Sequence, residues 1–231
     1  MKRFWRDVAV QEQAGGWGIS LDERPVRTPG RVPLLVPTPG LIEAIAQEWR
    51  AVETDIDPRA MPLTGLANAA IDRIAPDPAA FARALAAYGA SDLLCYRADA
   101  PAPLADRQRA AWDSVLDWAR GRYDVHFALA IGVMPVTQPA ATLERLGDAI
   151  AARSPFELAP LSVVVTITGS LVLALALIEG AADADSVWTA ANIDEDWQAE
   201  MWGEDSLATQ SRAVRSAEYT AANTFLALLN V

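Results

Sequence analysis

The sequence has few of the residues on which most enzymes and secreted proteins depend. Its 231 residues include one cysteine and one histidine. A single cysteine, Cys95, cannot form an internal disulfide, and nothing indicates an oxidising compartment. The Cys and His clusters of zinc sites are absent from the sequence. His126 lies among apolar residues, which favours a core or edge position over a catalytic one.

Signatures of catalysis and nucleotide binding are missing as well. There is no Gly-x-Ser-x-Gly elbow for a serine nucleophile and no Gly-x-x-x-x-Gly-Lys loop for phosphate. The glycine-rich stretch Gly15-Gly16-Trp17-Gly18 lacks a following helix, and we interpret it as a hairpin turn. The sequence therefore predicts no catalytic residues and no cofactor.

Positive charge is scarce along the chain. It has 19 Lys and Arg residues against 30 Asp and Glu residues, which gives a formal net charge of −11. This charge disfavours nucleic acid and anionic membrane surfaces as partners. Hydrophobic residues make up 52% of the chain, which is enough for a substantial core in one large domain or two modest ones.

The chain begins without a recognisable targeting segment. Residues 1–7 carry several charges, whereas a signal peptide needs an apolar run. Residues 161–178 have no charge, and this run is close to the length that spans a bilayer. The polar break at 168–170 and the acidic flanks at Glu157 and Glu179 favour a buried pair of helices over a membrane span. Hydroxyls within the run are expected to bond to carbonyls one helical turn back.

Changes of pattern along the chain predict an α+β fold. Short runs of strand formers between Gly and Pro residues predict a small antiparallel β-sheet in an N-terminal domain. Apolar residues at helical spacing then predict a larger helical C-terminal domain. The domains are expected at 1–60 and 61–231. The expected strands lie at 4–10, 17–21, 24–28 and 32–36, and the expected helices at 39–49, 63–74, 103–119, 142–152 and 214–228, the last with Val214, Ala217, Ala221, Phe225 and Leu228 on its apolar face.

The stretch from Ile193 to Asp205 contains six carboxylates and two tryptophans, with no Lys, Arg, His or Cys. Large aromatic side chains are costly to expose, so both tryptophans are expected to be buried against something. The like charges repel one another and favour a basic neighbour or water. Acidic and aromatic groups together suit binding to a protein. The alternative is a solvated helix whose Trp face enters the core.

The same stretch raises an alternative function. Asp196 and Glu200 are four residues apart on one helix face, a spacing that carboxylate metal sites use. A metal-dependent enzyme that uses the acidic cluster at 194–205 is therefore the second hypothesis. The missing nucleophile, base and phosphate loop favour a binding protein without a metal.

Motifs along nearly the whole chain resemble those of the assembly chaperones that bind the alpha subunit of ATP synthase, the "ATP-twelve" family. They occur in family order. The motifs are Leu21-Asp22-x-Arg24-Pro25, Ala44-Ile45-Ala46-x-Glu48-Trp49, Met61-Pro62-Leu63-Thr64, Asp92-Leu93-Leu94-Cys95-Tyr96-Arg97, Gly169-Ser170-Leu171-Val172 and Trp202-Gly203-Glu204-Asp205. The chain departs from many bacterial relatives after Asp205, where residues 206–210 lack further acids and arginines.

The resemblance implies a function that composition does not show. Family members hold the free alpha subunit, prevent its aggregation and yield it to the beta subunit, without catalysis or a cofactor. A bacterial member acts in the cytoplasm and its eukaryotic relatives in the mitochondrial matrix. We expect a protein that is monomeric when free and not inserted in the membrane.

The resemblance also implies site residues. Functional carboxylates of the family correspond to Asp194 and Asp196, and a family tryptophan corresponds to Trp49. The residues predicted to bind the partner are Asp194, Asp196, Glu200, Trp202, Glu204 and Asp205. We predict structural roles for Trp49 and Trp112, because each completes the apolar face of a helix.

Overall fold

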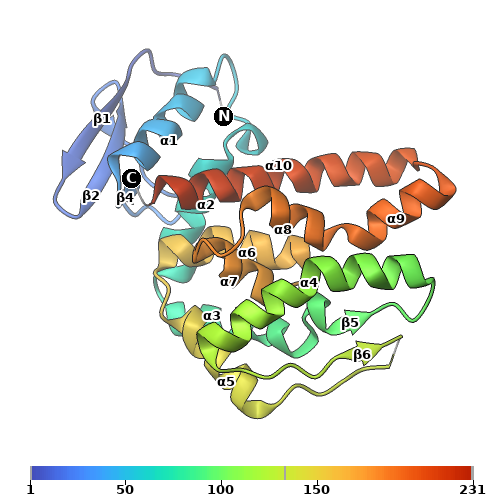
Figure 1. Ribbon diagram of the computed structural model, residues 1–231. Coiled ribbons are helices and arrows are strands. Elements are labelled where there is room, and N and C mark those ends of the chain that lie inside the picture. Colours follow the sequence, from blue (N-terminus) through green and yellow to red (C-terminus); the bar gives the residue numbers. More distant parts are fainter. Residues whose placement is uncertain (1, 133, 230–231) are drawn as a thin grey trace. The chain divides into compact units, whose positions relative to one another are not determined.

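The computed structural model describes residues 2–132 and 134–229, which form two compact units. The first unit comprises Met1–Pro78, Ser154–Pro160 and Ala217–Val231, and the second comprises Ala79–Arg153 and Leu161–Ser216. Figure 1 shows strands near the N-terminus followed by a mostly helical chain, as the α+β prediction requires. The predicted domain boundary after residue 60 stays a prediction, because compactness alone does not show where an independently folding domain ends.

A small antiparallel sheet forms the start of the first unit. Its strands are β1 (Val8–Gln13), β2 (Gly16–Leu21), β3 (Arg24–Pro25) and β4 (Leu35–Val36). β2 pairs with the other three strands. The turn before β2 needs glycine, because Gly16 has a φ of +142° and a Cβ there would lie 2.5 Å from the Val36 carbonyl oxygen.

The first strand begins later than predicted. Residues 4–7 are not in a strand, and the Trp5 side chain is buried in a small cluster with Leu21, Val52 and Met61. The predicted alternation from residue 4 was wrong because Trp5 packs into this cluster from outside the strand ladder. The third and fourth strands are also shorter than predicted, at two residues each.

Helix α1 (Pro39–Ala51) packs against this sheet. The Thr38 hydroxyl caps it by accepting from the Leu41 N–H at 3.3 Å and donates to the Leu228 carbonyl at 2.6 Å. The buried face carries Leu41, Ile42 and Ile45, as its helical spacing predicted. The Glu48 carboxylate on the same helix accepts the N–H groups of Leu63 and Thr64, which begin the next helix.

That next helix, α2 (Pro62–Ala69), continues as a π-helical turn over Ala70–Ile74. A 3-10 turn precedes it at Pro58–Ala60. The Asp72 carboxylate binds the chain between β3 and β4, accepting from the Thr28 hydroxyl at 2.6 Å and the Gly30 N–H at 2.7 Å. The end of the last helix, α10 (Ser206–Leu228), completes this core with the buried side chain of Phe225.

The predicted apolar face of the last helix is partly wrong. Phe225 is buried, but Val214 is 56% exposed and Ala217 is also exposed. The observed face carries Tyr219, Ala222, Phe225 and Leu226. The prediction relied on alanines, which carry too little apolar area to define a face.

The second unit is built around α7 (Leu171–Ile178). Every residue from Leu171 to Ala176 is 1% exposed or less. Helices α4 (Ala102–Tyr123) and α8 (Ala184–Ala191) pack against α7. The other elements of this part of the chain are α3 (Pro78–Ala86), 3-10 turns at Ala87–Ser91 and Leu93–Cys95, β5 (Tyr96–Arg97), β6 (Ala130–Ile131), α5 (Ala140–Ala151), α6 (Pro155–Thr168) and α9 (Ile193–Trp202).

The uncharged run at 161–178 forms two helices, as predicted. Gly169, with a φ of +65°, separates α6 from α7. The hydroxyls of Thr166 and Thr168 donate to carbonyls one turn back at 2.7 and 2.8 Å. Within the described part of the chain, no helix is long and apolar enough to cross a membrane.

Candidate partner-binding surface

The acidic stretch forms α9 and its connection to α10. Its first turn carries Asp194, Glu195 and Asp196. Carboxylates are favourable there, because the N-terminal end of a helix carries partial positive charge. The helix ends at Gly203, which has a φ of +85°. Asp205 then begins α10 by accepting the N–H groups of Leu207 and Ala208 at 2.9 Å.

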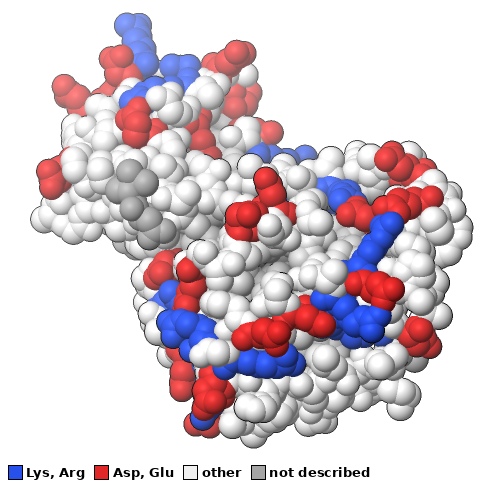
Figure 2. All heavy atoms as spheres, in the orientation of Figure 1, with Lys and Arg blue, Asp and Glu red and all other residues white. Residues whose placement is uncertain are grey.

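Besides Asp205, which accepts from backbone N–H groups, four of the six carboxylates contact side chains of the second unit. Arg212 pairs with Asp196 and Arg107 with Glu200, the latter at 2.8 Å. One Arg215 nitrogen contacts both oxygens of Glu195, at 2.8 and 2.7 Å. Asp194 accepts a hydrogen bond of 2.6 Å from the Gln108 amide. The basic neighbour that these charges favour therefore comes largely from the same chain, and Figure 2 shows acidic and basic side chains intermixed on the visible face.

The environment of Glu200 illustrates the effect of this pairing. The hydrogen bond from the Arg107 guanidinium lowers the pKa of the Glu200 carboxyl, and the positive charge of Arg107 adds to the effect. The pair is exposed to solvent, with about half of each side chain accessible, so it contributes little to stability. It keeps the carboxylate charged and oriented on the surface.

The two tryptophans of the stretch differ in burial. Trp197 is partly buried, and the Arg107 guanidinium lies 4.8 Å from its ring centroid. Trp202 is 79% exposed, so the alternative in which the Trp face of this helix enters the core is wrong for Trp202. The two residues are five positions apart, about 140° around a helix, and cannot share one face. Met201 and Leu207 are exposed beside the same turn, at 53% and 72%.

A hollow of about 750 Å³ lies between α9 and the start of α10. Its walls include Ala199, Trp202, Ala208, Asp196, Glu204 and Asp205. All six residues predicted to bind the partner thus lie on α9 or its connection to α10, and five of them line this hollow. Asp194 is directed to Gln108 instead and lines a second hollow with Trp197 and Trp202.

The arrangement does not form the metal site of the second hypothesis. Asp196 and Glu200 each contact an arginine, Arg212 and Arg107 respectively. Among residues 2–132 and 134–229, no group of three or more His, Cys, Asp or Glu side chains is placed to hold a metal ion. His126 is exposed rather than in the core, and its backbone groups bond to the Thr142 hydroxyl.

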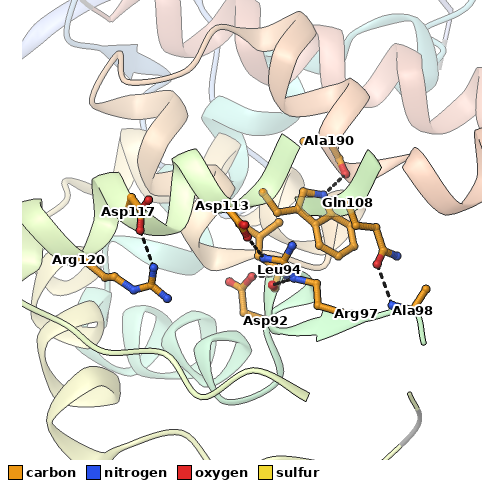
Figure 3. A network of polar contacts seen from close by, with 10 residues as sticks. Asp92, Leu94, Arg97, Ala98, Gln108, Asp113, Asp117, Arg120 and Ala190 are labelled. Atoms are coloured by element: carbon orange, nitrogen blue, oxygen red, sulfur yellow. Dashed lines mark hydrogen bonds and ion pairs between the residues drawn. The ribbon is translucent and has the colours of Figure 1, made fainter. Parts of the chain in front are cut away.

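Gln108 is a positioning residue that the sequence analysis missed. It is 2% exposed and lies on α4, where its side-chain oxygen accepts the Ala98 N–H at 2.8 Å while its amide donates to Asp194. Figure 3 shows the bond between Gln108 and Ala98, together with Arg97, which pairs with Asp113. The sequence held a signal for this role, because the helical spacing from Leu104 places polar Gln108 on the buried face of α4.

The two tryptophans predicted to be structural have different surroundings. Trp112 is 1% exposed, and its indole N–H donates to the Ala190 carbonyl at 2.8 Å. The Arg97 guanidinium lies 5.0 Å from the centroid of its ring. Trp49, in the other unit, is only partly buried. It packs against Trp5, and the centroids of the two rings are 5.3 Å apart. Within the described structure its indole nitrogen is buried without a hydrogen-bond partner.

Comparisons with known proteins agree with this fold. Residues 2–120 match the family described as ATP12 chaperone protein. Atp12 from Paracoccus denitrificans is 45% identical, with a TM-score of 0.93 over 99% of this chain and 98% of that one. A solved mutant of the same protein is 42% identical, with a TM-score of 0.89 over 99% of this chain and 97% of that one. A protein of Agrobacterium tumefaciens, whose description proposes a chaperone, is 41% identical, with a TM-score of 0.93 over 99% and 86%.

Proposed function

Because the chain belongs to the ATP12 family of ATP synthase assembly chaperones, we propose that it binds the unassembled alpha subunit of the catalytic head. In this proposal it prevents aggregation of that subunit and yields it to the beta subunit. Members of the family are chaperones and not enzymes, which sets aside the metal-dependent enzyme of the second hypothesis. Both named source organisms are bacteria, and we place this activity in a bacterial cytoplasm.

The exposed apolar group at the end of α9 carries the proposal. Met201, Trp202 and Leu207 are each more than half exposed within a short stretch of chain. Exposed large apolar groups that lie together are typical of protein-binding surfaces. An unassembled subunit exposes apolar interface of its own, which favours aggregation until it is covered. Contact between the two surfaces removes both from water.

The carboxylates around this apolar group determine which proteins it attracts. Glu204 is exposed, and Asp205 lies beside it at the start of α10. Together with the net charge of −11, they favour encounter with a basic surface. Asp196 and Glu200 are already paired with Arg212 and Arg107, so a basic client competes with these internal partners. Such competition keeps binding moderate, which suits a chaperone that releases its client.

An aggregation assay with matched variants tests the proposal. We expect the wild-type chain to keep the purified alpha subunit of its own ATP synthase soluble, and Trp202→Ser to lose most of this activity. Tyr88→Ser is the matched control, because Tyr88 is an aromatic residue of the second unit that is 37% exposed and lies outside both hollows bordered by Trp202. Equal activity of the two variants, or no effect of the wild type, would refute the proposed function.

A further inference from the structure

We infer that a second hollow, beside β5, β6 and the end of α9, binds a cationic side chain of the client protein, an arginine or a lysine flanked by apolar residues. The inference rests on the proposed function and adds the chemistry of the segment that is recognised. It concerns side chains of the second unit only, from β5 and the residues after it, from the start of α4 and from α9.

The hollow has a volume of about 400 Å³ and combines aromatic with acidic walls. Its aromatic walls are Tyr96, Trp197 and Trp202, and its carboxylates are Asp99 and Asp194. Aromatic faces and carboxylates both attract a guanidinium or ammonium group, the first through the ring quadrupole and the second by direct charge. Arg107 already lies over Trp197 at 4.8 Å, so a ring of this wall accepts a guanidinium within the chain itself.

The charges that face the hollow leave it acidic. Asp99 is exposed, and one of its oxygens lies 3.8 Å from where a Cβ on Gly132 would be. One Asp194 oxygen accepts from Gln108, which holds the carboxylate in place. Arg97 also borders the hollow, but it pairs with Asp113 at 2.8 Å and its side chain is 7% exposed. Asp113 offsets this charge, whereas the buried Nη1 of Arg97 has no hydrogen-bond partner within the described structure.

Exposed apolar side chains lie close in sequence to two of the residues that line the hollow. Next to Gly132, Ile131 is 72% exposed, and Met134, two positions on, is 71% exposed. Trp202 lines the hollow itself, and Leu207, five positions further along the chain, is 72% exposed. The sequence has no Asp, Glu, Lys or Arg between Asp124 and Glu144, although exposed strands are commonly protected by such charges. The apolar border thus extends the surface already proposed for the client at the end of α9.

Charge complementarity favours the client over a second copy of this chain as the occupant. A second copy also carries a net charge of −11, and its approach brings like charges together. A basic side chain with apolar neighbours satisfies both parts of the site at once, since the carboxylates gain a counter-charge while the apolar border leaves water. We therefore assign the hollow to a basic and apolar segment of the client.

Binding measurements with charge-reversed variants test this assignment. We expect Asp99→Lys to weaken binding of the purified alpha subunit by about tenfold or more, because a like charge replaces the counter-charge of the client. It should also reduce the dependence of the affinity on salt. Glu144→Lys is the matched control, since Glu144 is an exposed carboxylate of the same unit outside the hollow. The affinity of this variant for the alpha subunit should stay within about twofold of wild type. Ile131→Ser should weaken binding several-fold through lost apolar contact.

Photo-crosslinking identifies the occupant directly. With p-benzoylphenylalanine at position 131, we expect crosslinks to an alpha-subunit peptide that contains Arg or Lys between apolar residues. Crosslinks to another copy of the chain, or to an acidic peptide, would overturn the inference. If the wild type binds the alpha subunit and both Asp99→Lys and Ile131→Ser bind it equally well, the inference is overturned while the proposed function stands. Absence of any wild-type binding would refute the proposed function itself.

Discussion

Replacing Asp92 with asparagine tests how the second unit is held together. Asp92 is fully buried, and its carboxylate accepts from the Leu94 N–H, the Ser170 hydroxyl and the Val172 N–H at 2.8 to 3.0 Å. These bonds join the 3-10 turn after Asp92 to the first turn of α7, the most buried helix. Asparagine has one acceptor oxygen, so its amide group would face a donor. We expect Asp92→Asn to lower the free energy of unfolding by about 1–3 kcal/mol at neutral pH.

The pH dependence of this loss provides the sharper test. Burial raises the pKa of Asp92 from 3.8 to about 6, although its hydrogen bonds act in the opposite direction. Between these two values the folded state binds more protons than the unfolded state, so the contribution of Asp92 to stability falls as pH rises. This pH-dependent part is fully present below about pH 4 and has been lost above about pH 6, where only the pH-independent cost of the substitution remains. The difference corresponds to about 3 kcal/mol.

Urea denaturation of both proteins at several pH values measures this contribution. Each protein gives a curve of unfolding free energy against pH. Subtracting the variant curve from the wild-type curve removes the contributions of the other carboxylates. These include Glu43 and Glu179, whose pKa values are lowered in the folded state and whose stabilisation is lost in acid. We expect the stability advantage of the wild type to be larger at pH 4.5 than at pH 7. An advantage that is independent of pH, or that grows with pH, would refute the account of Asp92.

Three further variants test buried and exposed positions of the second unit. Trp112→Ala should lower the free energy of unfolding by about 3–5 kcal/mol, because it removes a buried ring and its bond to Ala190, and thermal or urea denaturation measures this. Near-wild-type stability would contradict its structural role. Gln108→Leu should destabilise by about 1–3 kcal/mol and weaken alpha-subunit binding, since Asp194 loses its hydrogen bond. Asp194→Lys with Asp196→Lys should leave the melting temperature within a few degrees but weaken binding of the alpha subunit and so reduce suppression of its aggregation. Unchanged suppression would count against these positions.

Local patterns predicted the fold where neighbours in sequence determine the structure. Thr38 and Pro39 begin α1, Gly169 separates two buried helices, and glycines form the turn before β2. Each of these features depends on a few adjacent residues whose backbone preferences are strong. The α+β division followed from the same signals.

The candidate surface was only partly predictable, because its geometry depends on distant residues. The acidic stretch contains no basic residue, yet Arg107 reaches Glu200 from 93 positions away, and Arg212 and Arg215 reach back from the next helix. Helical spacing does not show which side of α9 faces solvent, so the exposure of Trp202 was missed. The hollow beside β5 and β6 joins three separated segments that no local motif connects.

We propose that this chain holds the alpha subunit only until the beta subunit takes it. Light scattering after size-exclusion chromatography of the chain with its own alpha subunit measures this. We expect a complex with one copy of each protein, from which added beta subunit displaces the chain. The proposal would be contradicted if no complex forms, or if the complex persists unchanged when beta subunit is present.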